Sequence, residues 1–219
     1  MELLPVDSAH PDRRVLDAAA EAVLRGGVIA FPTDTLYGLG CSLFDVSAVE
    51  MISRLKRRPP GMAVISLIPE PEQAWGLALD VSAVATKLIR TCWPGPLSII
   101  FRASGLVPVR VQGAGGTVAL RCPNDPLSLA LLNRIGGPVV SSSANLSGQR
   151  PAETAAEVVG YFGNQLDLVL DGGPRRGGVP STLVDLSGPR PKLFRRGVLD
   201  VTGLLGDFED ATGDANRGG

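Results

Sequence analysis

Histidine and cysteine are scarce in this sequence of 219 residues, which has one histidine, His10, and three cysteines. His10 lies in a polar N-terminal segment that we expect to be mobile, so Ser-His-Asp catalysis, Cys-His catalysis and histidine-rich metal sites are disfavoured. The cysteines are widely spaced and form no CxxC motif, which indicates neither a disulfide framework nor a zinc cluster. Any reaction must therefore rely on positioning and electrostatics.

An excess of positive charge is also lacking, since the formal net charge is -1 and the pI is near 5.9. No protein-wide field can gather nucleic acid or an anionic membrane, so any anion site must be local. The sequence has no run of about 18 apolar residues and no apolar stretch typical of a signal peptide. We therefore expect a soluble cytoplasmic protein with no membrane association.

The pattern of apolar residues predicts an α/β fold in which helices alternate with short strands. At 44% hydrophobic residues, the chain can bury one sizeable core. Strands are predicted at residues 28–31, 62–68, 97–101, 117–121, 138–142, 166–170, 181–186 and 192–195, and helices at 12–25, 45–58, 81–90, 126–135 and 153–162. These elements form a single domain over residues 1–206 with a mixed, twisted sheet, followed by a disordered polar tail over 207–219.

Four cations in RLKRRPP, residues 54–60, lie where the second helix must end before its two prolines. One interpretation is a solvated basic cap that complements the helix dipole. Alternatively, Lys56 and Arg58 point to one side and clamp a polyphosphate, the lysine as a point charge and the arginine as a fork. The usual nucleotide signatures GxxxxGK[ST] and GxGxxG are absent, so a nucleotide would have to bind in an uncommon way.

Polar side chains follow three strands. VVSSSANLSG, residues 139–148, is either a hydrogen-bonded Ser/Asn turn or a ligand site at a strand end. In FPTDTLYGLG, residues 31–40, a strand stops at Pro32 and two threonines flank Asp34. Arg121 ends TVALR and is weak evidence alone, because a single arginine at a strand end is commonly ion-paired.

Seven motifs together resemble one family, the YrdC-like threonylcarbamoyl-AMP synthases in their short, single-domain form. In order they are GGVIAFPTDTLYGLG, LKRRP, WPGPLSII, TVALRCP, VVSSSANLSG, STLVDLSG and KLFRRG. The resemblance as a whole runs from about residue 12 to residue 203. The resemblance implies a twisted open α/β sheet with a large concave cavity.

The resemblance also implies an enzyme, a nucleotidyltransferase. Such an enzyme makes L-threonylcarbamoyl-adenylate from L-threonine, bicarbonate and ATP, with release of pyrophosphate. The product serves threonylcarbamoyladenosine modification of tRNA beside the anticodon, so a downstream tRNA threonylcarbamoyl transferase is an implied partner. Mg²⁺ with the ATP, and weak direct binding of tRNA, are further implications.

Site residues follow from the matching motifs. Lys56 and Arg58 match the family's KxR pair, and Ser143 and Asn145 match its SxN pair; all four are implied in catalysis and in ATP binding. Thr117 and Arg195 also match ATP-binding positions. The positions that match threonine contacts are Thr35, Arg121, Ser141 and Ser181. No protein ligand to a metal is implied.

One region departs from the family pattern. Met62 and Ala63 stand where the family usually has Lys or Asn and then Pro, and Leu67 stands where some members have histidine. A nucleotide contact at Met62 is therefore lost or made by backbone. Two alternatives are a paralogue that acts on another carbamoylated or adenylated compound, and a non-catalytic module that binds double-stranded RNA or tRNA.

Overall fold

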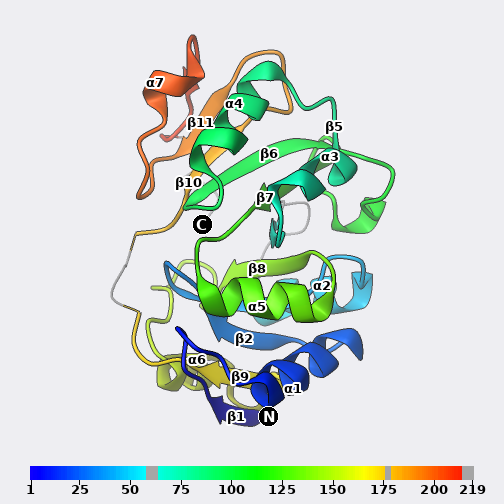
Figure 1. The fold of residues 1–219 in the computed structure, drawn as a ribbon, viewed down its shortest axis with the longest axis vertical. Coiled ribbons are helices and arrows are strands. Elements are labelled where there is room, and N and C mark those ends of the chain that lie inside the picture. Colours follow the sequence, from blue (N-terminus) through cyan, green and yellow to red (C-terminus); the bar gives the residue numbers. More distant parts are fainter. Residues whose placement is uncertain (58–63, 176–178, 214–219) are drawn as a thin grey trace.

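The computed structural model describes residues 1–57, 64–175 and 179–213, and Figure 1 shows its arrangement. Its strands are β1 (Glu2–Pro5), β2 (Ile29–Pro32), β3 (Tyr37–Ser42), β4 (Ile65–Leu67), β5 (Ala78–Leu79), β6 (Leu97–Ala103), β7 (Thr117–Arg121), β8 (Val139–Ser143), β9 (Leu168–Asp171), β10 (Thr182–Asp185), β11 (Lys192–Arg195) and β12 (Glu209–Asp210). The α-helices are α1 (Arg13–Leu24), α2 (Val46–Leu55), α3 (Ala74–Leu77), α4 (Ala83–Cys92), α5 (Pro126–Ile135), α6 (Ala155–Phe162) and α7 (Thr202–Leu205). Short 3-10 turns span Pro71–Gln73, Val109–Val111 and Gly163–Gln165.

These strands form one open mixed sheet in the order β1-β9-β2-β3-β8-β4-β7-β6-β10-β11-β12, with β5 paired to β6. Parallel and antiparallel neighbours both occur: β4 and β7 are parallel, whereas β3 and β8 are antiparallel. The sheet runs along the long axis of the molecule, with β1 near one end and β10 and β11 near the other (Figure 1). The twisted mixed sheet with flanking helices confirms the predicted fold class.

Helix boundaries follow local chemistry. Asp45 caps α2 by accepting a hydrogen bond from the backbone N–H of Ala48, and Asp125 caps α5 in the same way. Thr154 and Glu157 form a reciprocal capping box at the start of α6. The predicted helices therefore begin within about two residues of their observed starts, as capping rules lead one to expect.

Helices cover the two faces of the sheet unequally. Helices α1 and α5 pack together over one face, on a cluster that includes Ile29, Phe31, Leu67 and Val139. The larger cluster on the opposite face takes in residues of α2, α4 and α6. Figure 1 shows α1 and α5 side by side over the half of the sheet near β1, away from β10 and β11. On the face that α1 and α5 cover in part, polar side chains such as Ser98 and Arg121 lie where these two helices do not cover the sheet.

The short elements α3, β5 and α7 were not predicted, and three further segments differ from the sequence-based prediction. The polar N-terminal segment, predicted to be mobile, contains β1, which pairs in parallel with β9. Residues 37–42, for which no strand was predicted, form β3, in which the buried Tyr37 and Leu39 alternate with glycines. In the predicted tail over 207–219, Glu209 and Asp210 form β12 beside β11, so its first part is ordered. Residues 214–219 lie outside the described residues.

Candidate functional site

The register of the central strands places the candidate side chains on one face of the sheet. Arg121 lies across from Leu67 of β4, and Ser98 of β6 lies on its other side. Side chains alternate along a strand, so Thr117 lies on the same face of the sheet as Arg121. On β8, Ser141 and Ser143 likewise lie on one face. This is the face covered in part by α1 and α5. The sequence alone could not show which side chains from different strands share this face, because register is a property of paired strands.

Two arginines, the buried Arg121 and the partly buried Arg195, lie close together at one end of this face. The Arg121 guanidinium donates to the carboxylate of Asp34, and its Nε donates to the backbone oxygen of Gly95 at 3.0 Å. Arg195, from β11, donates through Nε to the backbone oxygen of Ser181 at 3.0 Å and through Nη2 to the Ser181 hydroxyl at 3.2 Å. The arrangement brings together the predicted Arg121, Arg195 and Ser181.

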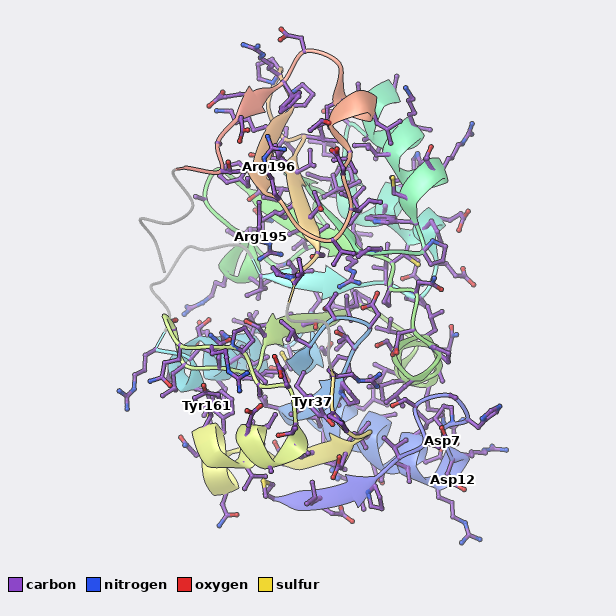
Figure 2. All side chains as sticks on the ribbon, turned by 90° about the vertical axis from the view of Figure 1, so that its left-hand side faces the viewer. Asp7, Asp12, Tyr37, Tyr161, Arg195 and Arg196 are labelled. Carbon is purple, nitrogen blue, oxygen red and sulfur yellow. The ribbon has the colours of Figure 1, made fainter. Side chains whose placement is uncertain are left out.

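Burial and charge act on both arginines. Burial lowers the pKa of Arg121, and the neighbouring carboxylate of Asp34 opposes that shift. Burial also lowers the pKa of Arg195, and the positive charge of Arg121 lowers it further. Arg195 lies about midway along the long axis in Figure 2, whereas its neighbour Arg196 lies further up and pairs with Asp210. Two guanidinium groups that repel each other in a buried site favour an anion between them.

Lys56 forms a second cluster with the polar end of β8. It caps α2 and is 5% exposed, and its Nζ donates to the backbone oxygens of Ser143 and Asn145, the latter at 3.0 Å. It also donates to Oδ1 of Asn145 at 3.0 Å, and the Ser143 hydroxyl donates to the same Oδ1 at 2.6 Å. The predicted KxR lysine and SxN pair therefore form one hydrogen-bonded unit that carries a positive charge.

The loop after β2 folds next to β8. Thr33 is 5% exposed, and its hydroxyl donates to the backbone oxygen of Leu36 at 2.8 Å. The hydroxyls of Thr33 and Thr35 lie 3.1 Å apart. Gly38 lies across from Ser143, and a Cβ at Gly38 would come 2.7 Å from the Ser141 hydroxyl. The predicted Thr35 and Ser141 thus belong to the same neighbourhood.

One predicted residue, Thr117, stands apart from the arginine cluster. Thr117 is at the opposite end of β7 from Arg121, roughly 13 Å along the strand at about 3.3 Å per residue. Its hydroxyl donates to the backbone oxygen of Ala114 at 3.2 Å. The structure does not bring Thr117 to the arginine cluster, although the two share a face. Arg58, like Met62 and Ala63, lies outside the described residues.

Two functional candidates were missed by sequence reasoning. Asp34 was noted only as a residue between two threonines, yet it is the carboxylate that pairs with Arg121. Ser98 is fully buried on β6, and its hydroxyl lies 2.8 Å from that of Ser181. The acidic residue in PTDT was a usable signal for Asp34. Ser98 sits within an apolar strand and offered none.

The part of the chain that the structure describes offers neither a cluster of metal ligands nor a helix that could span a membrane. Within that part of the chain, no group of three or more His, Cys, Asp or Glu side chains is placed to hold a metal ion. No described helix is long and apolar enough to cross a membrane. Two surface hollows, of about 260 and 560 Å³, are lined by residues other than the predicted site residues. The predicted concave cavity stays a prediction.

Relatives of known sequence were found across most of the chain. A threonylcarbamoyl-AMP synthase from Cellvibrio japonicus is 39% identical over 168 residues, which are 77% of this chain and 89% of the relative. One from Pyrococcus abyssi is 37% identical over 183 residues, 84% of this chain and 54% of the relative. The uncharacterized protein YciO of Escherichia coli is 33% identical over 198 residues, which are 90% of this chain and 95% of that protein. The chain thus spans about half the length of the Pyrococcus relative.

Solved structures agree with these matches. Pyrococcus abyssi Sua5 complexed with L-threonine superposes with a TM-score of 0.90 at 32% identity, covering 95% of this chain and 62% of that chain. Escherichia coli YciO superposes with a TM-score of 0.86 at 31% identity, covering 94% of this chain and 100% of that chain. A family model named for Sua5, YciO and YrdC, and described as telomere recombination, matches residues 21–197. The chain therefore belongs to the Sua5/YciO/YrdC family.

Proposed function

We propose that the protein is a threonylcarbamoyl-AMP synthase, an enzyme that makes L-threonylcarbamoyl-adenylate from L-threonine, bicarbonate and ATP. The observation that carries the proposal is the pair of cationic clusters on and beside one face of the sheet, Lys56 with Ser143 and Asn145, and Arg121 with Arg195. The product carries two anionic groups, the threonine carboxylate and the adenylate phosphate. Two separate cationic clusters suit a molecule of this kind.

The relatives named threonylcarbamoyl-AMP synthase support the same activity. The Sua5 structure complexed with L-threonine supports the amino-acid substrate. Within the proposed site, Thr35, Ser141 and Ser181 surround the threonine, and Arg121 engages its carboxylate. Lys56, Arg58, Ser143, Asn145, Thr117 and Arg195 serve the nucleotide. Arg195, which lies beside Arg121, then stands where the two substrates meet.

The reaction proceeds in two steps. The threonine amine attacks the carbon of bicarbonate, water leaves, and a carbamate forms. A carbamate oxygen then attacks the α-phosphorus of ATP, and pyrophosphate leaves as the mixed anhydride forms. Phosphoryl and nucleotidyl transfers of this kind need positioning and charge stabilisation more than covalent help from the protein. Lys56 and Arg195 supply that charge within the described residues, and no histidine is needed.

Mg²⁺ would enter with the nucleotide. The described residues offer no cluster of three or more His, Cys, Asp or Glu side chains for a resident metal. Mg²⁺ is commonly held by substrate phosphates and water with few protein ligands, which suits such a site. We infer that the ion belongs to the ATP substrate, and that a cytoplasmic tRNA threonylcarbamoyl transferase consumes the product. Direct binding of tRNA would be weak because the net charge is -1.

The test is pyrophosphate release from purified protein mixed with ATP, Mg²⁺, bicarbonate and L-threonine. We expect release that requires threonine and bicarbonate together, and threonylcarbamoyl-adenylate as the accompanying product. Release that is indifferent to threonine, or no release, would overturn the proposal. Omission of each substrate in turn provides the controls.

A second candidate is a paralogous reaction on another carbamoylated or adenylated compound. It is favoured by the match to YciO over 95% of that protein, whose name carries no activity, and by the departures at Met62, Ala63 and Leu67. The same assay with other amino acids, and with carbamoyl phosphate in place of bicarbonate, separates the two. Faster pyrophosphate release with one of these compounds than with threonine would select the paralogous reaction.

A further inference from the structure

Asp34 uses its two carboxylate oxygens differently. Its Oδ2 accepts a hydrogen bond from the Arg121 guanidinium in an ion pair in which both side chains are largely buried. Its Oδ1 is also buried, and it accepts no hydrogen bond from any group in residues 1–57, 64–175 and 179–213. A buried carboxylate oxygen without a donor is costly. The Asp34 carboxylate therefore has the capacity for one further strong donor.

Near Asp34, the side chain of Arg195 lacks a carboxylate partner among the described residues. Arg121 and Arg195 repel each other, and among the described residues Asp34 is the carboxylate that pairs with Arg121, while none pairs with Arg195. Asp125, a further buried carboxylate, acts on Arg121 without forming an ion pair, so among the described residues Arg195 is the cation of this cluster with no carboxylate at ion-pair distance. Buried charges normally require a partner. A ligand with one carboxylate would supply the missing negative charge.

A free amino acid satisfies both needs at once. Its carboxylate supplies a negative charge for Arg121 and the neighbouring Arg195, and its amino nitrogen, two bonds away, carries N–H donors. Resting on the proposed function, we propose that Oδ1 of Asp34 binds the α-amino nitrogen of the amino-acid substrate. Asp34 thereby selects substrates that carry an α-amino group, and it aims the nitrogen lone pair at the incoming carbon.

The contact persists through the reaction. The nitrogen donates an N–H as an ammonium group, as the free amine and as the carbamate, so Asp34 can accept throughout. The acceptor also fixes which hydrogen faces the protein and which direction is left for bond formation. Asp34 is therefore assigned a direct contact with substrate, in addition to its contact with Arg121.

The competing explanation is that Asp34 serves only to hold Arg121 in place. Binding measurements on two ligands distinguish the two roles. L-threonine has the amino group, and 3-hydroxybutanoate is the same molecule without it. Each is titrated by calorimetry into the wild-type protein and into Asp34→Asn, which keeps the size of the side chain and removes its charge.

We expect Asp34→Asn to weaken threonine binding by roughly ten- to a hundredfold, the range for a hydrogen bond to a charged group. Binding of 3-hydroxybutanoate should stay the same or tighten, because its carboxylate no longer competes with Asp34 for Arg121. The dissociation constant of 3-hydroxybutanoate divided by that of L-threonine therefore falls in the variant. Equal weakening of both ligands would overturn the inference and leave Asp34 as a support for Arg121.

Controls separate this outcome from other failures. Asp207 is an exposed carboxylate that pairs with Arg190, so Asp207→Asn should leave both dissociation constants unchanged. Thermal unfolding of Asp34→Asn shows whether the variant is folded, and Asp34→Glu, which restores the charge, should recover part of the threonine affinity. If threonine fails to bind the wild-type protein, the proposed function is wrong and the inference falls with it. If threonine binds the wild-type protein but Asp34→Asn leaves the ratio of the two dissociation constants unchanged, only the inference about Asp34 is overturned.

Discussion

Gly38 of β3 lies beside Ser141 of β8, and a Cβ at Gly38 would come 2.7 Å from the Ser141 hydroxyl oxygen. The nearest obstacle to a side chain at Gly38 is therefore a group of the candidate site. Gly40, two residues along, differs in this respect. A Cβ there would come 2.5 Å from the ring of Phe31 and 3.2 Å from the backbone oxygen of Val140. Gly38 thus leaves room for the Ser141 hydroxyl of the candidate site, whereas Gly40 leaves room for the ring of Phe31 in the core.

Substitution of the two glycines should separate function from stability. Gly38→Ala pushes the Ser141 hydroxyl out of position, and a serine hydroxyl rotates easily, so we expect a threonine KM raised severalfold and a small change in Tm. Gly40→Ala meets a buried ring and backbone, so we expect it to lose roughly 1–3 kcal/mol of unfolding free energy, as overpacking typically does. Steady-state kinetics and chemical denaturation measure the two effects. The same loss of stability in both variants would contradict the distinction.

Lys56 should be essential for turnover. Lys56→Met removes the charge from the nucleotide cluster, and a single electrostatic contact of this kind is commonly worth about a hundred- to a thousandfold in kcat. It also removes one donor from the backbone oxygens of Ser143 and Asn145 and from Oδ1 of Asn145, which costs on the order of 1–3 kcal/mol of stability. Arg54→Met, an exposed cation on the same helix, is the matched control. A Lys56→Met enzyme that turns over at the rate of the Arg54→Met enzyme would show that the cluster is structural.

Thr35 and Thr33 should respond differently to removal of the hydroxyl. The Thr33 hydroxyl donates to Leu36 and accepts from the backbone N–H groups of Thr35 and Leu36, so Thr33→Ala should lower Tm. Thr35 is only partly buried and makes its side-chain contact with Thr33. We expect Thr35→Ala to raise the KM for threonine more than that for ATP, with little change in Tm. Equal increases in both KM values would contradict the assignment of Thr35 to the amino-acid pocket.

Elements with strong local signals could be predicted from the sequence, and those defined by distant partners could not. Strand β7 and helix α5 are predicted with their observed bounds, because alternation and an aspartate cap mark them locally. Strand β1 was missed because its four residues become a strand only by pairing with β9, more than 160 residues later. Short edge strands of this kind carry little pattern of their own.

The candidate site shows the same division. Lys56, Ser143 and Asn145 could be named from motifs, and the structure brings them into contact. Asp34 could not be assigned, because its significance depends on Arg121, which is 87 positions away in the chain. The motifs assigned Arg121 to threonine binding without showing that a protein carboxylate already pairs with it. Long-range ion pairs are set by the fold, and a single sequence does not reveal them.

Tyr37 should make the protein sensitive to alkaline pH. Its buried hydroxyl donates to the backbone oxygen of Gly173 at 2.8 Å and accepts from the N–H of Gly172 at 3.2 Å. Burial, reinforced by the nearby charge of Asp171, raises the pKa of Tyr37 to about 12. Between pH 10 and 12 the unfolded chain therefore loses the proton while the folded protein keeps it, so the unfolding free energy falls as pH rises.

Tyr37→Phe isolates this contribution. The variant should be less stable at pH 7 by roughly 1–3 kcal/mol, because two partly buried backbone groups, the oxygen of Gly173 and the N–H of Gly172, lose their partner. The gap between wild type and variant should narrow as pH rises from 10 towards 12, since only the wild type has this proton to lose. Burial also raises the pKa of Cys41 to about 12, and that effect is common to both proteins and cancels in the difference. Urea unfolding at several pH values measures the gap, and a gap that stays constant would show that Tyr37 does not titrate as its surroundings require.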